Sequence, residues 1–140
     1  MQRKASAIWQ GGLKNGKGTL STASGTLKET PYSFTMRFEN APGTNPEELV
    51  AAAHAGCFAM ALSAQLEPAG MTPERLDVTA TVTMEKGDGG WAVIASHLEL
   101  AARIPGADEE KFRAAAEGAK AGCPISKLLN AKITLDAKLN

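Results

Sequence analysis

The stretch "NPEELVAAAHAGCFAMALSAQL", Asn45 to Leu66, decides the fold because it predicts one long and almost entirely apolar helix. Asn45 is a favourable helix cap, Pro46 suits the first helical position, and the charge of Glu47 is favoured near the positive end of the helix dipole. At 1.5 Å per residue, about 20 residues span roughly 30 Å, the width of a small domain. Alanine and leucine occupy nearly every side of the helix, so most of its surface is expected to be buried.

Strand patterns precede this helix. Residues 4–9 and 18–23 are rich in strand-forming residues and are joined by a glycine-rich segment whose Asn15-Gly16 step suits a hairpin turn. Residues 31–38, "PYSFTMRF", alternate strictly between two kinds of side chain and are expected to form a further strand. On such a strand Arg37 would point away from the face that carries Tyr32, Phe34, Met36 and Phe38.

A hairpin, a helix and a last strand are expected after the long helix. Alternation at Leu76–Met84 and again at 91–104 predicts two strands joined through "GDGG". Helical spacing follows over 108–121, a short helix is entered through Pro124, and residues 131–139 alternate again. The order indicates an α+β fold with mainly antiparallel sheets. We expect a single domain over 1–140, with N-terminal strands in 1–40, a central helix at about 46–66, and the hairpin, helix and strand in 75–140.

Composition excludes several classes of protein. The chain has 140 residues with 15 basic and 15 acidic side chains, and no run of Lys or Arg that could follow a phosphate backbone, so nucleic acid is not an expected partner. The first residues turn polar and glycine-rich before a signal peptide could form. No window reaches the ~18 apolar residues of a membrane span, so we expect a cytoplasmic protein without a membrane partner.

Metal and cofactor chemistry are not expected either. The chain has two Cys and two His, without a CxxC or HxxxH pair, and a four-ligand zinc site would use all of them at unfamiliar spacings. In a reducing compartment the two cysteines are not expected to form a structural disulfide. They are either inert buried thiols or a reactive pair.

The position of Cys57 sets a condition on its reactivity. It lies twelve residues past the cap, beyond the reach of the helix dipole, so a reactive thiolate there needs a neighbouring cation, for which Arg37 is the best candidate. His54 lies three residues away on the same face, but such pairs arise readily, and a partly buried histidine that fills space is the simpler interpretation. Cys123 stands between a helix-ending glycine and Pro124, on a connection where a mobile thiol is expected.

Two longer runs carry a family resemblance. "RFENAPGTNPEELVAAAHAGCFAMAL" (37–62) and "KAGCPISKLLNAKITLDAKL" (120–139) resemble the two signature blocks of the OsmC/Ohr family, the osmotically inducible and organic hydroperoxide resistance proteins. The resemblance extends almost from end to end of the chain, with separate motifs in the right order. The histidine form "AAAHAGCF", together with "GKGTLST" near the N-terminus, is closer to the OsmC branch.

The resemblance implies a cysteine-based peroxidase that reduces organic hydroperoxides, and hydrogen peroxide less efficiently, in oxidative-stress defence. It implies an intertwined homodimer, with antiparallel sheets wrapped around long central helices and two active sites at the subunit interface. By position, Cys57 matches the peroxidatic cysteine, Cys123 the resolving cysteine, Arg37 the activating arginine and Glu47 the acid that holds it. The resemblance implies an external dithiol as reductant, of the lipoyl type in family members, although the residues themselves do not identify it, and we expect no cofactor.

A distance along the helix adds one inference that is independent of the family. Glu47 precedes Cys57 by ten residues, about 15 Å along a straight helix, so the acid cannot lie beside the thiol of its own chain. If Arg37, Glu47 and Cys57 form one cluster, a member of it comes from the other subunit, or the helix is broken early.

Two other functions remain open from the sequence. One is a Cys/His acyl-transfer enzyme with His54 as base, although the backbone N–H groups around Cys57 are used within the helix and offer no oxyanion hole. The other is a non-enzymatic dimeric stress or binding protein. Apolar residues near the motif could line a pocket for alkyl peroxides or simply form core: Phe34, Met36, Leu49, Phe58 and Met60.

Overall fold

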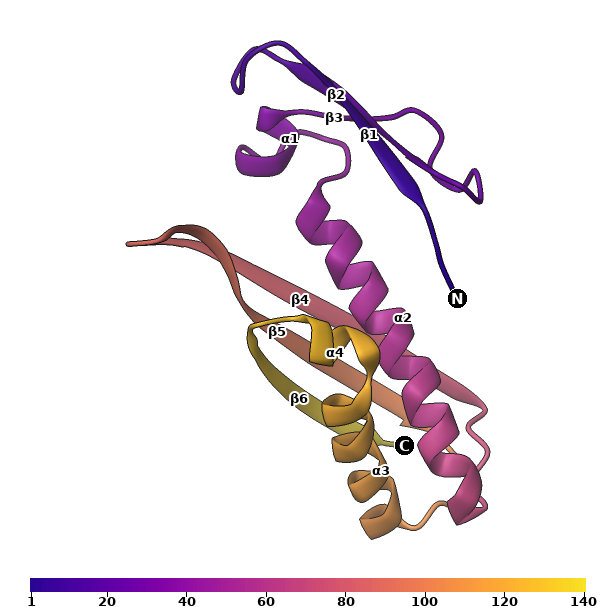
Figure 1. Cartoon of the computed structure of the whole chain (residues 1–140). Coiled ribbons are helices and arrows are strands. Elements are labelled where there is room, and N and C mark those ends of the chain that lie inside the picture. Colours follow the sequence, from indigo (N-terminus) through magenta and orange to yellow (C-terminus); the bar gives the residue numbers. More distant parts are fainter. The chain divides into compact units, whose positions relative to one another are not determined.

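The computed structural model describes all residues, Met1–Asn140. The chain forms two compact units, residues 1–49 and 50–140, and each is described by itself. Figure 1 shows the elements in chain order. Their bounds are β1 Ala5–Gln10, β2 Lys17–Thr22, β3 Thr30–Tyr32, α1 Phe34–Phe38, α2 Pro46–Leu66, η1 Glu67–Ala69, β4 Arg75–Gly87, β5 Gly90–Arg103, α3 Glu109–Gly122, α4 Pro124–Leu128 and β6 Lys132–Leu139.

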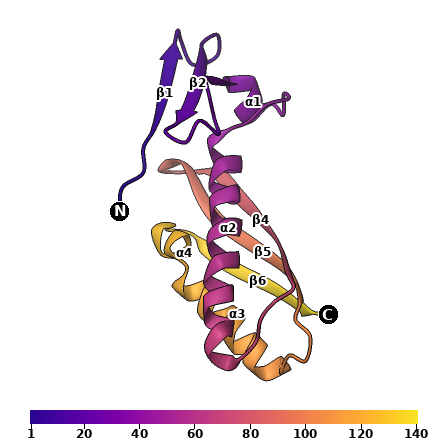
Figure 2. The same ribbon diagram turned by 90° about the vertical axis from the view of Figure 1, so that its right-hand side faces the viewer.

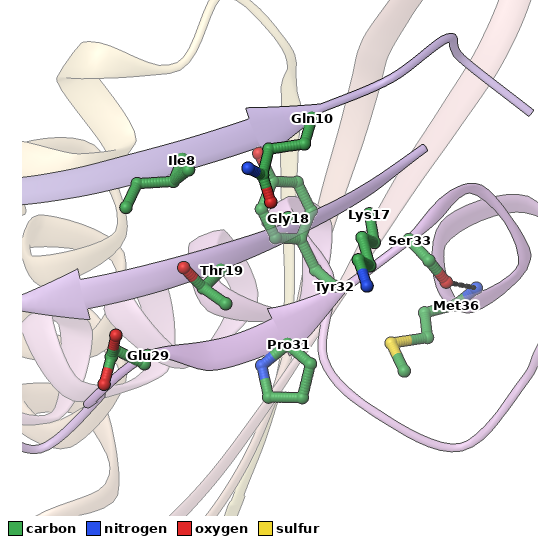
Figure 3. Close-up of a pocket in the computed structure, with 10 residues that line it drawn as sticks. All are labelled: Ile8, Gln10, Lys17, Gly18, Thr19, Glu29, Pro31, Tyr32, Ser33 and Met36. Atoms are coloured by element: carbon green, nitrogen blue, oxygen red, sulfur yellow. Dashed lines mark hydrogen bonds between the residues drawn. The ribbon is translucent and has the colours of Figure 1, made fainter. Parts of the chain in front are cut away.

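The N-terminal unit is built on an antiparallel sheet of three strands in the order β1-β2-β3. Ile8, Thr19 and Pro31 are neighbours across its strands and are drawn in Figure 3. The two predicted strands of the hairpin are present, but residues 11–16 all belong to the connection, closed by a bond from the Gly16 N–H to the Gly12 carbonyl. The Asn15-Gly16 step is therefore part of a longer loop and not a two-residue turn.

The prediction of one strand over 31–38 is wrong. Strand β3 ends at Tyr32, and Phe34–Phe38 form the short helix α1. The Ser33 hydroxyl accepts a hydrogen bond from the Met36 N–H and so caps this helix (Figure 3). The rings of Phe34 and Phe38, one helical turn apart, lie 4.9 Å centre to centre. The cap and this ring pair favour a helix over the alternation that the sequence suggested.

The long helix α2 is confirmed with the expected bounds, Pro46–Leu66. The side chain of Asn45 accepts a hydrogen bond from the Glu48 N–H at 2.8 Å, which caps the first turn. Two acidic residues, Glu47 and Glu48, lie in that turn. The helix ends in the 3₁₀ turn η1, which closes on Gly70 in a left-handed conformation (φ 70°).

We expected no segment long and apolar enough to cross a membrane. Judged by length and composition alone, that expectation is wrong, because one segment meets the description. The segment Pro46–Ala69 has a mean hydropathy of 1.5 over its best window, because its many alanines raise the average. One such helix is weak evidence, since the core helices of soluble proteins pass the same test. Phe58, Leu62 and Leu66 of this helix belong to the hydrophobic core.

The C-terminal unit contains a sheet in the order β4-β5-β6. Strands β4 and β5 form the predicted antiparallel hairpin, whereas β5 and β6 are parallel. The parallel pair departs from a purely antiparallel sheet because the helices α3 and α4 connect β5 to β6 and return the chain in the same direction. The predicted helix over 108–121 corresponds to α3, capped by Asp108, and the short helix after Pro124 corresponds to α4.

The core of this unit lies between the sheet and the helices, which run across one face of the sheet (Figures 1 and 2). Buried residues alternate along β5, where Ser96, Leu98, Leu100 and Ala102 face the helices. Phe58 from α2 and Phe112 from α3 are fully buried. Every buried hydrophobic side chain of the protein belongs to residues 50–140, so the N-terminal unit has no core of its own.

Gly18 of the central strand β2 allows the first sheet to pack closely. A methyl group at this position would lie 2.5 Å from the Ile8 carbonyl oxygen and 2.6 Å from the ring of Tyr32. We expect Gly18→Ala to destabilise the protein by about 1–3 kcal/mol, because the overlapping atoms include backbone that cannot move away. Urea unfolding of the full chain measures this. Gly12→Ala is the matched control, since nothing lies within 4 Å of its added methyl group, and an equal loss in both variants would contradict the explanation.

Candidate functional site

Cys57 lies in the middle of α2, in the C-terminal unit, and its side chain is partly buried. Its thiol is within hydrogen-bonding reach of the Cys123 thiol and of the backbone N–H of Ile125. Neither cysteine takes part in a disulfide. The structure therefore brings together two thiols that are far apart in the sequence.

The surroundings of Cys57 do not favour a thiolate within this unit. Burial raises the pKa of the Cys57 thiol, and the hydrogen bond and charge interaction with Cys123 raise it further. The backbone N–H of Ile125, in the first turn of α4, lowers it by less. A reactive Cys57 needs a cation that residues 50–140 do not place beside it.

Cys123 occupies the junction of two helices, as the last capping residue of α3 and the first of α4. We expected a mobile thiol on a connection, but the two helices meet at this residue and its side chain is fully buried. Its N–H donates to Ala119 and its carbonyl accepts from Lys127, so both helices use its backbone. The thiol is consequently held in place against Cys57.

Arg37 and Glu47 form an ion pair in the N-terminal unit. The Arg37 Nη2 lies 2.7 Å from Glu47 Oε1, and its Nε lies 3.2 Å from both carboxylate oxygens. The Arg37 guanidinium also lies 5.2 Å from the centre of the Phe38 ring. The prediction that Arg37 points away from the aromatic residues is wrong, because the segment is a helix and not a strand.

Two cavities adjoin α1 in the N-terminal unit. The smaller one, about 270 Å³, places Arg37 among aromatic and aliphatic side chains; it is lined by Trp9, Leu13, Tyr32, Ser33, Phe34, Arg37 and Phe38. The larger one, about 490 Å³, lies over one face of the first sheet and includes Met36 (Figure 3). Of the apolar residues suggested for a substrate pocket, only Phe34 therefore lies in the cavity of Arg37. Phe58 is fully buried core and Met60 is 78% exposed.

His54 is fully buried, more than the sequence suggested, and both of its ring nitrogens have partners. Nδ1 lies 2.7 Å from the Ser96 hydroxyl oxygen of β5, and Nε2 lies 2.8 Å from that of Ser126 in α4. Burial lowers the pKa of His54 and favours the neutral ring. Since neither nitrogen is directed at Cys57, the geometry gives no support to His54 as a general base for that thiol.

The two serines were missed in the sequence. Ser96 falls in the same alternating set as Ile94, Leu98 and Leu100, and a hydroxyl among inward-facing apolar residues is a signal that a buried polar partner exists. Ser126 follows Cys123 by three residues in a short helix and carries no comparable signal. Sequence reasoning had no means of joining it to His54.

The four residues expected in the active site thus form two pairs. Cys57 and Cys123 are in contact within 50–140, and Arg37 and Glu47 are in contact within 1–49. That the two pairs form one site stays a prediction.

Protonation of His54 should make stability depend on pH. Its folded-state pKa lies below the ordinary value of 6.5, so the unfolded chain takes up a proton before the folded protein does as pH falls. The stability due to the neutral ring is complete above about pH 6.5 and decreases below it. We expect the urea midpoint to fall between about pH 7.5 and about pH 5.5, and to fall less in His54→Gln. An unchanged pH dependence in the variant would contradict this account.

Comparison with known proteins places this chain in a family. The sequence profile described as OsmC-like protein matches residues 38–138. The chain is 50% identical over 139 residues to "Peroxiredoxin OsmC" of Escherichia coli K12, covering 99% of this chain and 97% of that protein.

Solved structures agree with this match. The organic hydroperoxide resistance protein of Elizabethkingia anophelis is 29% identical with a TM-score of 0.71, covering 100% of this chain and 99% of that one. OhrB of Bacillus subtilis is 25% identical with a TM-score of 0.70, covering 96% and 98%. The chain belongs to the OsmC-like family.

Proposed function

We propose that this protein is a thiol-dependent peroxidase that reduces organic hydroperoxides to alcohols. The observation that carries the proposal is the proximity of two free cysteines, one of them buried, between α2 and the start of α4. A peroxidase that resolves its oxidised cysteine intramolecularly needs such a pair. The 50% identity to a protein named peroxiredoxin supports the same reaction class.

The reaction proceeds in three balanced steps. The Cys57 thiolate attacks one peroxide oxygen, the O–O bond breaks, and the alkoxide takes up a proton and leaves as an alcohol while Cys57 becomes a sulfenic acid. The Cys123 thiol then attacks the Cys57 sulfur, and a disulfide forms with loss of water. An external dithiol, for which we propose the lipoyl type, reduces the disulfide by exchange.

Activation of Cys57 requires a cation, and Arg37 is the one we assign. Glu47 and Cys57 lie on the same unbroken helix α2, about 15 Å apart by helical rise. Since Glu47 holds Arg37 by a short ion pair, the pair does not reach the thiol of its own helix. The partner subunit's Arg37 would therefore face Cys57 in a homodimer, with Glu47 fixing the guanidinium.

Burial supports a homodimer as well. Residues 1–49 contain no buried hydrophobic side chain, and a unit of this size without a core is not stable alone. On α2, one side remains exposed and almost wholly small and apolar, with Ala53, Gly56, Met60 and Ala64 at helical spacing. A second copy of the chain would cover such surfaces, and cover Ile8 of the first sheet, which is 59% exposed.

The smaller cavity suggests where the organic part of the substrate binds. It combines Arg37 with the rings of Trp9, Phe34 and Phe38 in about 270 Å³. An alkyl or aryl group fits such a lining, while the guanidinium can donate to a peroxide oxygen. This arrangement favours organic hydroperoxides over hydrogen peroxide, which gains nothing from the apolar walls.

The cellular setting follows from the chemistry and the charge. Reduced thiols that are recycled by a dithiol suit the cytoplasm, where we place the protein in oxidative-stress defence. Equal numbers of basic and acidic side chains give no reason to expect nucleic acid as a partner.

The Cys/His acyl-transfer alternative has no specific observation in its favour, because both nitrogens of His54 are bonded to serines. A non-enzymatic binding protein would need no reactive thiol. Titration with a thiol reagent separates the two cases, since a peroxidase has one fast thiol and a binding protein has none.

Replacing each cysteine should have a different effect. In Cys57→Ser we expect loss of cumene hydroperoxide reduction, by at least about a hundredfold, since no nucleophile remains. In Cys123→Ser we expect Cys57 still to be oxidised, but to stop as a sulfenic acid that a dimedone probe traps. Intact mass after one equivalent of peroxide measures both results. Full turnover by Cys57→Ser with a dithiol present would refute the proposed function.

The subunit origin of Arg37 can be tested by mixing inactive variants. Cys57→Ser and Arg37→Ala chains are each expected to be inactive alone, since one lacks the thiol and the other the cation. In a mixed dimer, the intact thiol of one chain meets the intact Arg37 of the other. After subunit exchange we expect about a quarter of the parent activity, because half of the dimers then hold one complete site of two. An inactive mixture with verified heterodimers would mean that each site uses its own arginine.

A further inference from the structure

His54 is the one buried titratable group near the cysteines that the proposed reaction does not use. It bridges β5 and α4 through Ser96 and Ser126, and all three residues are at least nine-tenths buried. Two hydroxyls and one neutral imidazole satisfy one another, since one ring nitrogen donates and the other accepts. A buried polar network is unfavourable unless all its groups are hydrogen-bonded, and one that is satisfied holds its elements, here α2, β5 and α4, in fixed positions.

The contact between α2 and α4 has two points. His54 and Cys57 lie three residues apart on α2, and Cys123 and Ser126 stand three apart at the start of α4. Cys57 meets Cys123, and His54 meets Ser126. Residues three apart on a helix share a face, so each helix contributes one sulfur and one polar group to the same contact.

The helix α4 depends on such anchors. It has only five residues, too few to be stable without tertiary contacts. Its Leu128 is 75% exposed and contributes little packing. Beside the packing of Ile125 against the core, the hydrogen bond between His54 and Ser126 links α4, which begins beside Cys123, to α2, which carries Cys57.

We propose that His54, with Ser96 and Ser126, is a positioning residue that keeps Cys123 against Cys57 for disulfide formation. The inference rests on the proposed peroxidase function and concerns its second step. There, the Cys57 sulfenic acid either condenses with the Cys123 thiol and releases water, or reacts with a second hydroperoxide to give a sulfinic acid and an alcohol. A fixed Cys123 favours the first outcome.

Ser126→Ala tests the bridge because it deletes one hydroxyl and leaves both thiols and the His54–Ser96 bond. With cumene hydroperoxide and acid quenching, intact mass follows reduced protein, sulfenic acid, disulfide and sulfinic acid over time. We expect disulfide formation to slow on the order of threefold to tenfold. This is the effect of losing one hydrogen bond that keeps the two sulfur atoms in position to react. Oxidation of Cys57 should slow less, and the sulfinic fraction at excess peroxide should rise.

Two variants serve as controls. Thr134→Val deletes a hydroxyl that lies 2.6 Å from Nδ1 of His97, a histidine contact between β5 and β6 that does not involve α4. It should leave the ratio of disulfide to sulfinic acid as in the parent protein. Ser126→Thr keeps a hydroxyl at the bridge and should restore much of the rate, and amide exchange at Leu129 should be faster only in Ser126→Ala.

The outcomes are distinct. Unchanged disulfide formation in Ser126→Ala, or equal slowing in Thr134→Val, would overturn the positioning role and leave His54 as a packing residue. Should Ser126→Ala not fold, His54→Gln provides the same comparison, with slower disulfide formation expected. Failure of the peroxidase function would appear instead as a parent protein whose Cys57 is not oxidised by the hydroperoxide. Diamide then forms the disulfide directly, and the same order of rates among the variants is expected.

Discussion

The continuity of α2 is the constraint on which the arrangement of the site depends. A helix without a break holds Glu47 and Cys57 about ten helical rises apart, whatever else the chain does. The acid holds Arg37 through a short ion pair, while the thiol packs against Cys123. Because burial and the neighbouring Cys123 thiol raise the pKa of Cys57, one chain by itself supplies a poor nucleophile. Under the proposed function, assembly of two chains would then be what activates the thiol.

The elements with strong local signals could be predicted from the sequence. The start of α2 was readable because Asn45, Pro46 and the two glutamates each favour a helix start. The hairpin of β4 and β5 was equally clear from alternation. The strand prediction for residues 31–38 failed because eight residues can alternate between two kinds of side chain by chance. The contacts that form α1 instead join residues three and four apart, namely the Ser33 cap and the pair of phenylalanine rings.

The sequence named candidate residues for the site but not their contacts. Cys57, Cys123, Arg37 and Glu47 were chosen by the family resemblance of their motifs; the Arg37–Glu47 pair is present, and the role of the four as one site stays a prediction. The direct contact of the thiols depends on how α4 packs on α2, which no local pattern encodes. The same holds for His54: its neighbour Cys57 was visible in the sequence, whereas its true partners come from β5 and α4, 42 and 72 residues away.

Under the proposed mechanism, the resting contact between the thiols has opposite effects on the two chemical steps. It raises the pKa of Cys57, which disfavours the thiolate needed to attack a peroxide, and it places Cys123 where the sulfenic acid will form. The N–H of Ile125 partly offsets the first effect, and it belongs to the same short helix that begins at Cys123. Under that mechanism, the position of α4 would affect both steps at once. The His54–Ser126 hydrogen bond, by fixing α4, would favour disulfide formation but would also keep the pKa of Cys57 raised. The guanidinium of Arg37 from a second chain would then lower that pKa.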